Sequence, residues 1–185
     1  MSSHASSDVL ERLASSAERL SYNADWQPTQ LGDSEMRIAK NGTWYHQGDE
    51  IKRPALVRLF SRLLRREDEQ YFLVTPVEKL SIVVEDTPFV SIDTRIEGEG
   101  REQSVYVTTN LDDVLLISSE HPLCVEVDPQ TQEPSPSVSI GHHLAVRLQR
   151  SDFYRLVDVA TEQMLAGQRV LGVWSQGDFY SLGAF

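Results

Sequence analysis

Residues 36–60 read "MRIAKNGTWYHQGDEIKRPALVRLF", and this stretch decides the fold. Two short β-prone runs flank Asn41-Gly42, a dipeptide that tolerates positive φ at both centres of a type I′ hairpin turn. A second turn is indicated at residues 47–50. Pro54 then suits the first turn of a helix, where its missing N–H costs nothing. The stretch therefore predicts a β-hairpin that leads directly into a helix over residues 53–66.

The predicted helix has one apolar face and one basic face. The apolar side chains recur at i, i+4, i+7 and i+8, which is typical of a buried stripe; they are Leu56, Phe60, Leu63 and Leu64. The basic side chains fall largely on the other side, and they are Arg58, Arg62, Arg65 and Arg66.

The rest of the chain is rich in predicted strands. Short β-branched and aromatic runs are bounded by turn residues; in chain order they span residues 71–75, 80–85, 89–96, 104–109, 114–118, 123–127, 137–148, 169–174 and 179–183. Two more helices are expected, at residues 8–20 and 151–165. The sequence thus predicts an α+β fold of mainly antiparallel β structure with two principal amphipathic helices, at residues 53–66 and 151–165.

Three regions are expected along the chain. Residues 1–33 would form an N-terminal helix and loop, residues 34–128 a first lobe, and residues 129–185 a second lobe within one compact unit. The polar, Pro-rich stretch at residues 128–137 is the expected seam. Three identities at one constant offset, Arg53, Arg58 and Leu59 with Arg150, Arg155 and Leu156, favour a duplicated β-α-β-β motif.

Composition excludes several classes of function. The 185 residues carry 28 acidic against 17 basic side chains, for a net charge of −11. This field repels phosphate backbones and anionic membranes, so neither nucleic acid nor membrane is expected as a partner. The single cysteine, Cys124, excludes an intrachain disulfide and a four-cysteine zinc site, and its context predicts a buried strand. Without a secretory signal or an apolar run of about 20 residues, we expect a cytoplasmic protein.

Polar and aromatic residues gather in the opening stretch and after residue 74. Trp44 and His46 would share one strand face, Arg53 follows the second turn, and Arg58 lies on the helix. The run "VTPVEK" at residues 74–79 adds two charges. The candidate ligand-binding residues are therefore Trp44, His46, Arg53, Arg58, Glu78 and Lys79. In the purely architectural alternative, Trp44 is core and Arg53 pairs with Asp49 or Glu50 at the surface.

Other clusters predict no chemistry. The run "GEGREQ" at residues 98–103 lacks the third glycine of a dinucleotide loop and carries two glutamates where a pyrophosphate would lie. His142 and His143 would point to opposite faces of a strand, as would His121 and Cys124. We therefore expect no cofactor and no metal, and the favoured interpretation assigns no catalytic residue.

An ordered set of motifs resembles the bacterial domain-of-unknown-function family twelve eighty-five (DUF1285). The motifs are "NGTWYHQGDEIKRPALVRLF", "YFLVTPVEK", "VVEDTPFV", "TTNLDD", "EHPLCV", "RSDFYRLV" and "LGVWSQGDFYSLG", from about residue 34 to the C-terminus. The resemblance implies an α+β fold of repeated motifs in two parts and a suggested role in bacterial signal transduction. It supplies no catalytic residues. The family has an arginine and glycine stretch where this chain has Gly141-His142-His143, which argues against anion binding there.

Three functions follow as hypotheses. The first is a non-catalytic module that binds a small ligand or a protein in a groove between the lobes. The second is a small hydrolase or transferase that uses His46 as a base, oriented by Glu50 or Glu78. The third is a protein-interaction surface on the arginine-rich face of residues 53–66. The sequence leaves the ligand and the oligomeric state open.

Overall fold

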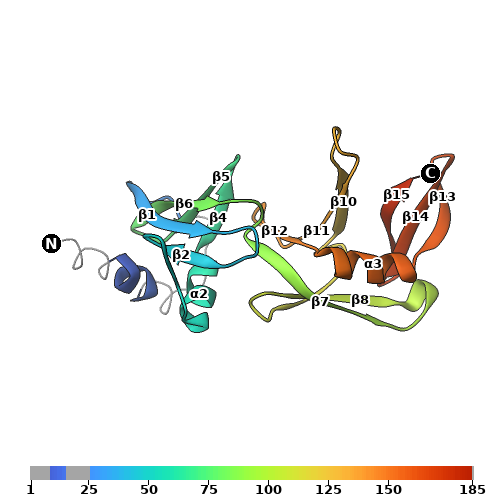
Figure 1. Cartoon of the computed structure of the whole chain (residues 1–185), viewed down its shortest axis with the longest axis horizontal. Helices are drawn as coiled ribbons and strands as arrows, with labels where there is room; N and C mark the ends of the chain where they lie inside the picture. Colours follow the sequence, from blue (N-terminus) through green and yellow to red (C-terminus); the bar gives the residue numbers. More distant parts are fainter. Residues whose placement is uncertain (1–8, 16–25, 185) are drawn as a thin grey trace. The chain divides into compact units, whose positions relative to one another are not determined.

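The computed structural model describes residues 9–15 and 26–184, and it divides into two compact units, residues 1–88 and 89–185 (Figure 1). The seam expected at residues 128–137 lies inside the second unit. There the chain turns between two paired strands, because Asp128 accepts backbone hydrogen bonds from Gln130 and Thr131. A polar, Pro-rich run marks a turn as readily as a linker.

The first unit is built on one six-stranded sheet with the strand order β3-β2-β1-β6-β5-β4. The strands are β1 (Gln30–Ile38), β2 (Trp44–His46), β3 (Asp49–Glu50), β4 (Leu64–Glu67), β5 (Gln70–Val74) and β6 (Glu78–Val84). Only β1 and β6 pair in parallel; all other neighbours are antiparallel. Helix α2 (Pro54–Ser61) buries Val57 and Phe60. Residues 9–15 are helical and bury Leu13 completely, while residues 16–20 of the predicted helix lie outside the described residues.

The predicted hairpin is confirmed, but the type I′ turn predicted at Asn41-Gly42 is not formed there. Between β1 and β2 only Gly42 has positive φ, and the Gly42 N–H donates to the Ala39 carbonyl at 2.8 Å, so a longer loop connects the strands. The next turn has positive φ at both Gln47 and Gly48 (51° and 89°). The two-residue turn of the I′ class is therefore the one that joins β2 to β3.

The predicted helix over residues 53–66 is half helix and half strand. Helix α2 stops at Ser61, and Leu64–Glu67 forms β4, which pairs with β5. Sheet pairing overrides the helical periodicity here, because β4 buries Leu64 and gains cross-strand hydrogen bonds. Arg65 is consequently only 9% exposed and donates to the Trp26 carbonyl at 3.2 Å. The expected arginine-rich helix face therefore does not exist as one surface.

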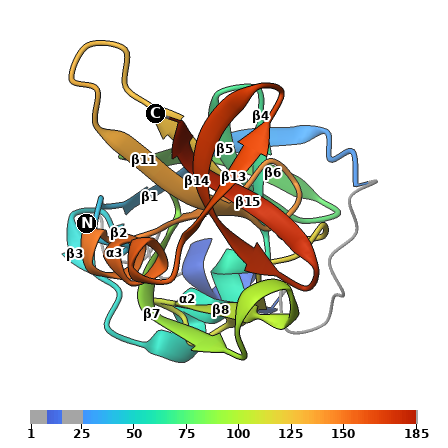
Figure 2. The same cartoon turned by 90° about the vertical axis from the view of Figure 1, so that its right-hand side faces the viewer.

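The second unit contains two sheets. A six-stranded sheet has the order β10-β11-β12-β7-β8-β9, and a three-stranded sheet, facing the viewer in Figure 2, has the order β13-β14-β15. The elements are β7 (Phe89–Glu97), the 3₁₀ helix η1 (Gly100–Glu102), β8 (Ser104–Thr109), β9 (Val114–Leu116), β10 (Leu123–Val127), β11 (Pro134–Ser139), β12 (Ala145–Arg147), α3 (Arg150–Asp158), β13 (Thr161–Leu165), β14 (Gln168–Ser175) and β15 (Asp178–Ala184).

Three predictions in the second unit were wrong in detail. The expected strand at residues 137–148 is two antiparallel strands, because His142 and His143 adopt positive φ (50° and 60°) in the connecting turn. The helix expected over residues 151–165 ends at Asp158, since β13 pairs with β14 instead. Cys124, expected to be buried, is exposed on β10.

The fold class is confirmed as α+β, with mixed and mainly antiparallel sheets in two units. The predicted repetition is present as well: a helix followed by a β-hairpin occurs as α2-β4-β5 in the first unit and as α3-β13-β14 in the second. In the described part of the chain, no helix is long and apolar enough to span a bilayer.

Candidate functional site

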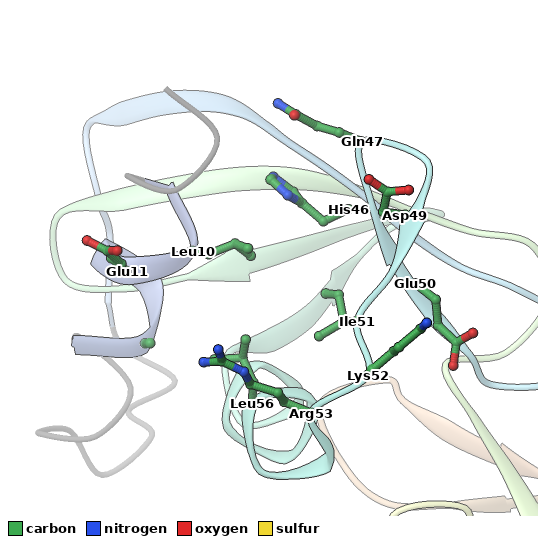
Figure 3. A pocket seen from close by; sticks show the side chains of 11 residues that line it. Leu10, Glu11, His46, Gln47, Asp49, Glu50, Ile51, Lys52, Arg53 and Leu56 are labelled. Carbon is green, nitrogen blue, oxygen red and sulfur yellow. The ribbon is translucent and has the colours of Figure 1, made fainter. Parts of the chain in front are cut away.

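A cavity of about 600 Å³ opens in the first unit between the helix of residues 9–15, the β2–β3 turn and the beginning of α2 (Figure 3). Each wall comes from a different element. The helix contributes Leu10, Glu11 and Ala14. The turn and the two strands it joins contribute His46, Gln47, Asp49 and Glu50, and the segment entering α2 contributes Ile51, Lys52, Arg53 and Leu56. The local order of hairpin, turn and Pro54-started helix is what brings the last two groups together.

His46 is the buried polar group of this cavity. Its backbone pairs with Met36 on β1 and with Asp49 on β3, and the side chain is directed toward the helix of residues 9–15 (Figure 3). The residue is only 8% exposed. Its Nε2 atom is buried and has no hydrogen-bond partner among the described residues. A buried nitrogen without a hydrogen-bond partner is uncommon in folded proteins, because it has lost its hydrogen bonds to water and no protein group replaces them.

Arg53 lies at the opposite side of the cavity, where it immediately precedes Pro54. Its backbone carbonyl accepts the N–H groups of Leu56 and Val57, which fixes the residue at the start of α2. The side chain is exposed and makes no ion pair with the residues that the structure describes. In Figure 3 the guanidinium extends beside Leu56 on the side that faces the helix of residues 9–15. The expected surface pairing of Arg53 with Asp49 or Glu50 is therefore not formed in the described structure.

Charges of both signs surround the cavity. The acids are Glu11, Asp49 and Glu50, and the bases are Lys52 and Arg53. Glu50 and Lys52 point to the side away from the helix of residues 9–15 (Figure 3). The apolar side chains of Leu10, Ile51 and Leu56 lie between His46 and Arg53. The arrangement offers a hydrophobic wall with one hydrogen-bonding group and one cation.

The six predicted site residues do not all converge. His46 and Arg53 line the cavity, whereas Trp44 is 2% exposed and belongs to the core, as the architectural alternative expected. Arg58 lies on α2 and is exposed, outside the cavity lining. Glu78 forms an ion pair with Arg12 (Oε2–Nη2, 3.3 Å) and lines a separate hollow.

Lys79 is engaged elsewhere on the sheet. It forms an ion pair with Glu67, and its Nζ lies 4.2 Å from the centroid of the Phe72 ring. The hydrogen bond from Lys79 holds the pKa of the Glu67 carboxyl below its ordinary value; burial opposes this shift, and the charge of Lys79 and the hydrogen bond from Arg65 add to it. This cluster is a structural one, on the sheet rather than at the cavity.

Sequence reasoning missed the wall formed by the helix of residues 9–15. A helix over residues 8–20 was expected, but none of its residues was a candidate for the site. Leu13 of this helix is buried in the core, and Leu10 and Ala14, one helical turn apart, line the cavity beside it. The four-residue spacing of Leu10 and Ala14 was the available sequence signal. It indicates a cavity wall only once the position of the sheet is known.

The described residues contain no group of three or more His, Cys, Asp or Glu side chains positioned to hold a metal ion. The acid–base pair required for the enzymatic hypothesis is also not assembled there. Glu78 lies with Arg12, Glu50 points away from the helix of residues 9–15, and Nε2 of His46 contacts neither carboxylate. The described lining thus presents polar and apolar surface without an assembled acid–base pair.

Fold and cavity together define a two-unit α+β protein with a ligand-sized cavity in its first unit. The model of the DUF1285 N-terminal domain, a domain of unknown function, matches residues 23–87, and that of the DUF1285 C-terminal domain matches residues 88–182. The chain belongs to the DUF1285 family. The two domains of the family meet where the compact units divide.

Two solved structures are similar to this chain. A DUF1285 family protein from Silicibacter pomeroyi DSS-3 is 40% identical, with a TM-score of 0.78 over 93% of this chain and 94% of that chain. A DUF1285 family protein from Shewanella baltica OS155 is 24% identical, with a TM-score of 0.52 over 66% of this chain and 90% of that chain, and shows the fold alone. No curated protein is significantly similar to this chain.

Proposed function

We propose that this protein is a non-catalytic, cytoplasmic binding module whose first unit holds a small molecule in the cavity beside the helix of residues 9–15. The observation that carries the proposal is that His46 lines the cavity while its buried Nε2 atom has no hydrogen-bond partner among the described residues. Leaving such an atom unsatisfied costs about 1–3 kcal/mol. A ligand that supplies the missing partner recovers this free energy.

The size and lining of the cavity support the same proposal. Its volume of about 600 Å³ falls in the usual range for pockets that hold small molecules. Apolar side chains with a few convergent polar groups are also the usual lining of such pockets. Because three separate elements supply the walls, the cavity depends on the folded unit rather than on one flexible loop.

The alternative is a small hydrolase or transferase that uses His46 as its base. General-base catalysis requires a group that orients the imidazole within hydrogen-bond reach. The two carboxylates expected for that role, Glu50 and Glu78, point elsewhere or pair with Arg12. This geometry favours binding over catalysis.

A role in signal transduction would use the helix wall. Arg12 connects the helix of residues 9–15 to Glu78 at the start of β6, while Leu10 and Ala14 face the cavity on the same helix. A ligand that contacts Leu10 would therefore change how firmly the helix is held. Binding and helix position would be linked, which is what a signalling module needs.

The experiment is a fragment screen by ¹H–¹⁵N NMR on the full-length protein. We expect several fragments to shift the amide signals of residues 46–53 and of Leu10. The variant Ala14→Trp fills the cavity with an indole and should abolish these shifts. Ser15→Trp places the same indole at the next position, which lines the separate hollow with Glu78, and should leave them unchanged.

Fragment shifts that persist in Ala14→Trp, or that map away from the cavity, would contradict the proposed function. Both variants must first give dispersed spectra like that of the unmodified protein, because a lost fold would also remove binding.

A further inference from the structure

A second cavity, of about 240 Å³, lies in the second unit between β11 and the beginning of α3. We infer that it is a separate binding site for a small aromatic monoanion, whose acidic group pairs with Arg150 and whose ring packs on Tyr154. The site goes beyond the function proposed for the first unit and does not depend on it. Three features lead to the inference: the shape of the cavity, an exposed cation, and an aromatic side chain next to that cation.

The cavity has a buried apolar floor and an exposed rim. The floor consists of Pro136, Leu148 and Phe153, all of which are buried. The Leu148 N–H donates to the Pro136 carbonyl at 2.9 Å, which fixes this floor where β12 leads into α3. Arg150 and Tyr154 line the same cavity and are exposed. The volume lies below the range of about 300–1,000 Å³ that is usual for drug-sized ligands, so the cavity suits a molecule with a single ring.

Arg150 supplies the positive charge. A guanidinium stays protonated at physiological pH and presents its donors in a planar fork that matches the two oxygens of a carboxylate. The Arg150 side chain is exposed, and no acidic side chain in the described parts of the chain forms an ion pair with it. An acidic ligand therefore reaches this cation without displacing a carboxylate of the protein.

Tyr154 is the neighbour of Arg150 on the helix. The two residues are four positions apart on α3, so their side chains share one face, with about 5–6 Å between Cβ atoms. One small molecule can therefore contact both, provided that its acidic group lies close to its ring. The Tyr154 side chain is 56% exposed, and a ligand ring can cover part of it by stacking or by an edge contact.

A proline wall bounds the cavity on the side of β11. Pro134 and Pro136 are two positions apart on this strand, so both rings lie on one side of it, and both line the cavity. Pro134 is exposed and Pro136 is buried, so the wall extends from the rim to the floor. A flat ring that enters the cavity thus covers apolar surface on the strand as well as on the helix.

The charges at the cavity favour a single acidic group. Arg147 lines the cavity together with Arg150, against one acid, Glu133. The lining is therefore positive, although the whole chain carries a net charge of −11. The two arginines repel an amine, while Glu133 and the net charge raise the cost of bringing in a dianion.

The test compares four probes of similar size: phenylacetate, 2-phenylethanol, 2-phenylethylamine and cyclohexylacetate. Each is titrated into the full-length protein, and Kd is taken from the amide shifts of residues 148–154. We expect phenylacetate to bind at least fivefold more tightly than each of the other three. The alcohol and the amine test the acidic group, and cyclohexylacetate tests the aromatic ring.

Three variants assign the preference to residues. Arg150→Gln should make phenylacetate and 2-phenylethanol bind equally. Arg155→Gln removes the same charge from the same helix and should keep the preference, because Arg155 pairs with Asp93 and does not line the cavity. Tyr154→Leu should make phenylacetate and cyclohexylacetate bind equally. All three replaced side chains are exposed, so the variants should retain dispersed spectra.

Several results would overturn the inference. They are the absence of shifts at residues 148–154 with phenylacetate, an affinity for the alcohol or the amine equal to that for phenylacetate, equal binding of cyclohexylacetate, and a preference that survives Arg150→Gln or is lost equally in Arg155→Gln. None of these results decides the function proposed for the first unit, whose signals are those of residues 46–53.

Discussion

Replacing His46 with phenylalanine tests whether its buried nitrogen serves stability or binding. A histidine held for structural reasons is hydrogen-bonded, and its removal destabilises the fold. Nε2 of His46 has no hydrogen-bond partner among the described residues, so no protein hydrogen bond offsets the free-energy cost of removing this atom from water. The ring of phenylalanine has a similar shape, and the adjoining cavity of about 600 Å³ gives room for its extra atoms.

The expected magnitude follows from that difference. An unpaired buried polar group costs about 1–3 kcal/mol, and an apolar group of the same shape does not bear this cost. Allowing for imperfect packing of the new ring, we expect His46→Phe to raise the free energy of unfolding of the first unit by about 1 kcal/mol. The same substitution should weaken the binding of fragments that form a hydrogen bond at the cavity. The variant would thus be more stable and less functional, as is common where a site is kept for binding.

The matched control is His121→Phe in the second unit. Nδ1 of His121 lies 3.2 Å from the Ser139 carbonyl oxygen, so this histidine has a structural partner. Its replacement should lower the free energy of unfolding of the second unit by about 1 kcal/mol. Guanidinium denaturation followed through the indole N–H signals of Trp44 and Trp174 reports each unit separately. A His46→Phe variant that loses 1 kcal/mol or more in the first unit would refute the reasoning.

Three further predictions concern stability. The pKa of Glu67 is lowered chiefly by its hydrogen bond with Lys79, so the stability from this group is present above its ordinary pKa of 4.5 and is lost as the pH falls below that value. Glu67→Gln should therefore reduce the loss of unfolding free energy on acidification, by less than about 1 kcal/mol because Glu67 is partly exposed. An unchanged dependence of the unfolding free energy on pH would contradict this role. Gly172→Ala would place a Cβ 2.4 Å from the Tyr180 carbonyl oxygen and should destabilise the second unit by about 1–3 kcal/mol in chemical denaturation. In the control Gly183→Ala the new Cβ meets nothing within 4 Å and should have little effect. Equal effects of the two substitutions would refute the steric argument. Ser175→Ala removes a hydroxyl that donates to the Ile117 carbonyl at 2.6 Å and accepts the Val105 N–H at 3.1 Å. The two buried groups left unpaired should lower the free energy of unfolding by about 2–4 kcal/mol in the same assay. A loss below about 1 kcal/mol would show that neither bond matters.

The sequence by itself determined the class of fold and many of its strands. Runs such as residues 89–96 and 104–109 are bounded by turn residues and became β7 and β8. Alternating side chains and turn chemistry are local properties, so they can be read without knowing the partner strand. The repeated order of helix and hairpin was also visible, because it depends on segments that follow one another in the chain.

Only the tertiary structure decided where helices give way to strands and which side chains meet. The run "LLRR" at residues 63–66 continues a helical period, yet residues 64–66 pair with β5, because the gain from joining a sheet exceeds a weak local preference. His46 and Arg53 share a cavity while Glu78 and Lys79 do not, although all four were candidates from the sequence. Convergence of side chains depends on strand order and on the docking of the helix of residues 9–15. These are long-range contacts, and no local pattern encodes them.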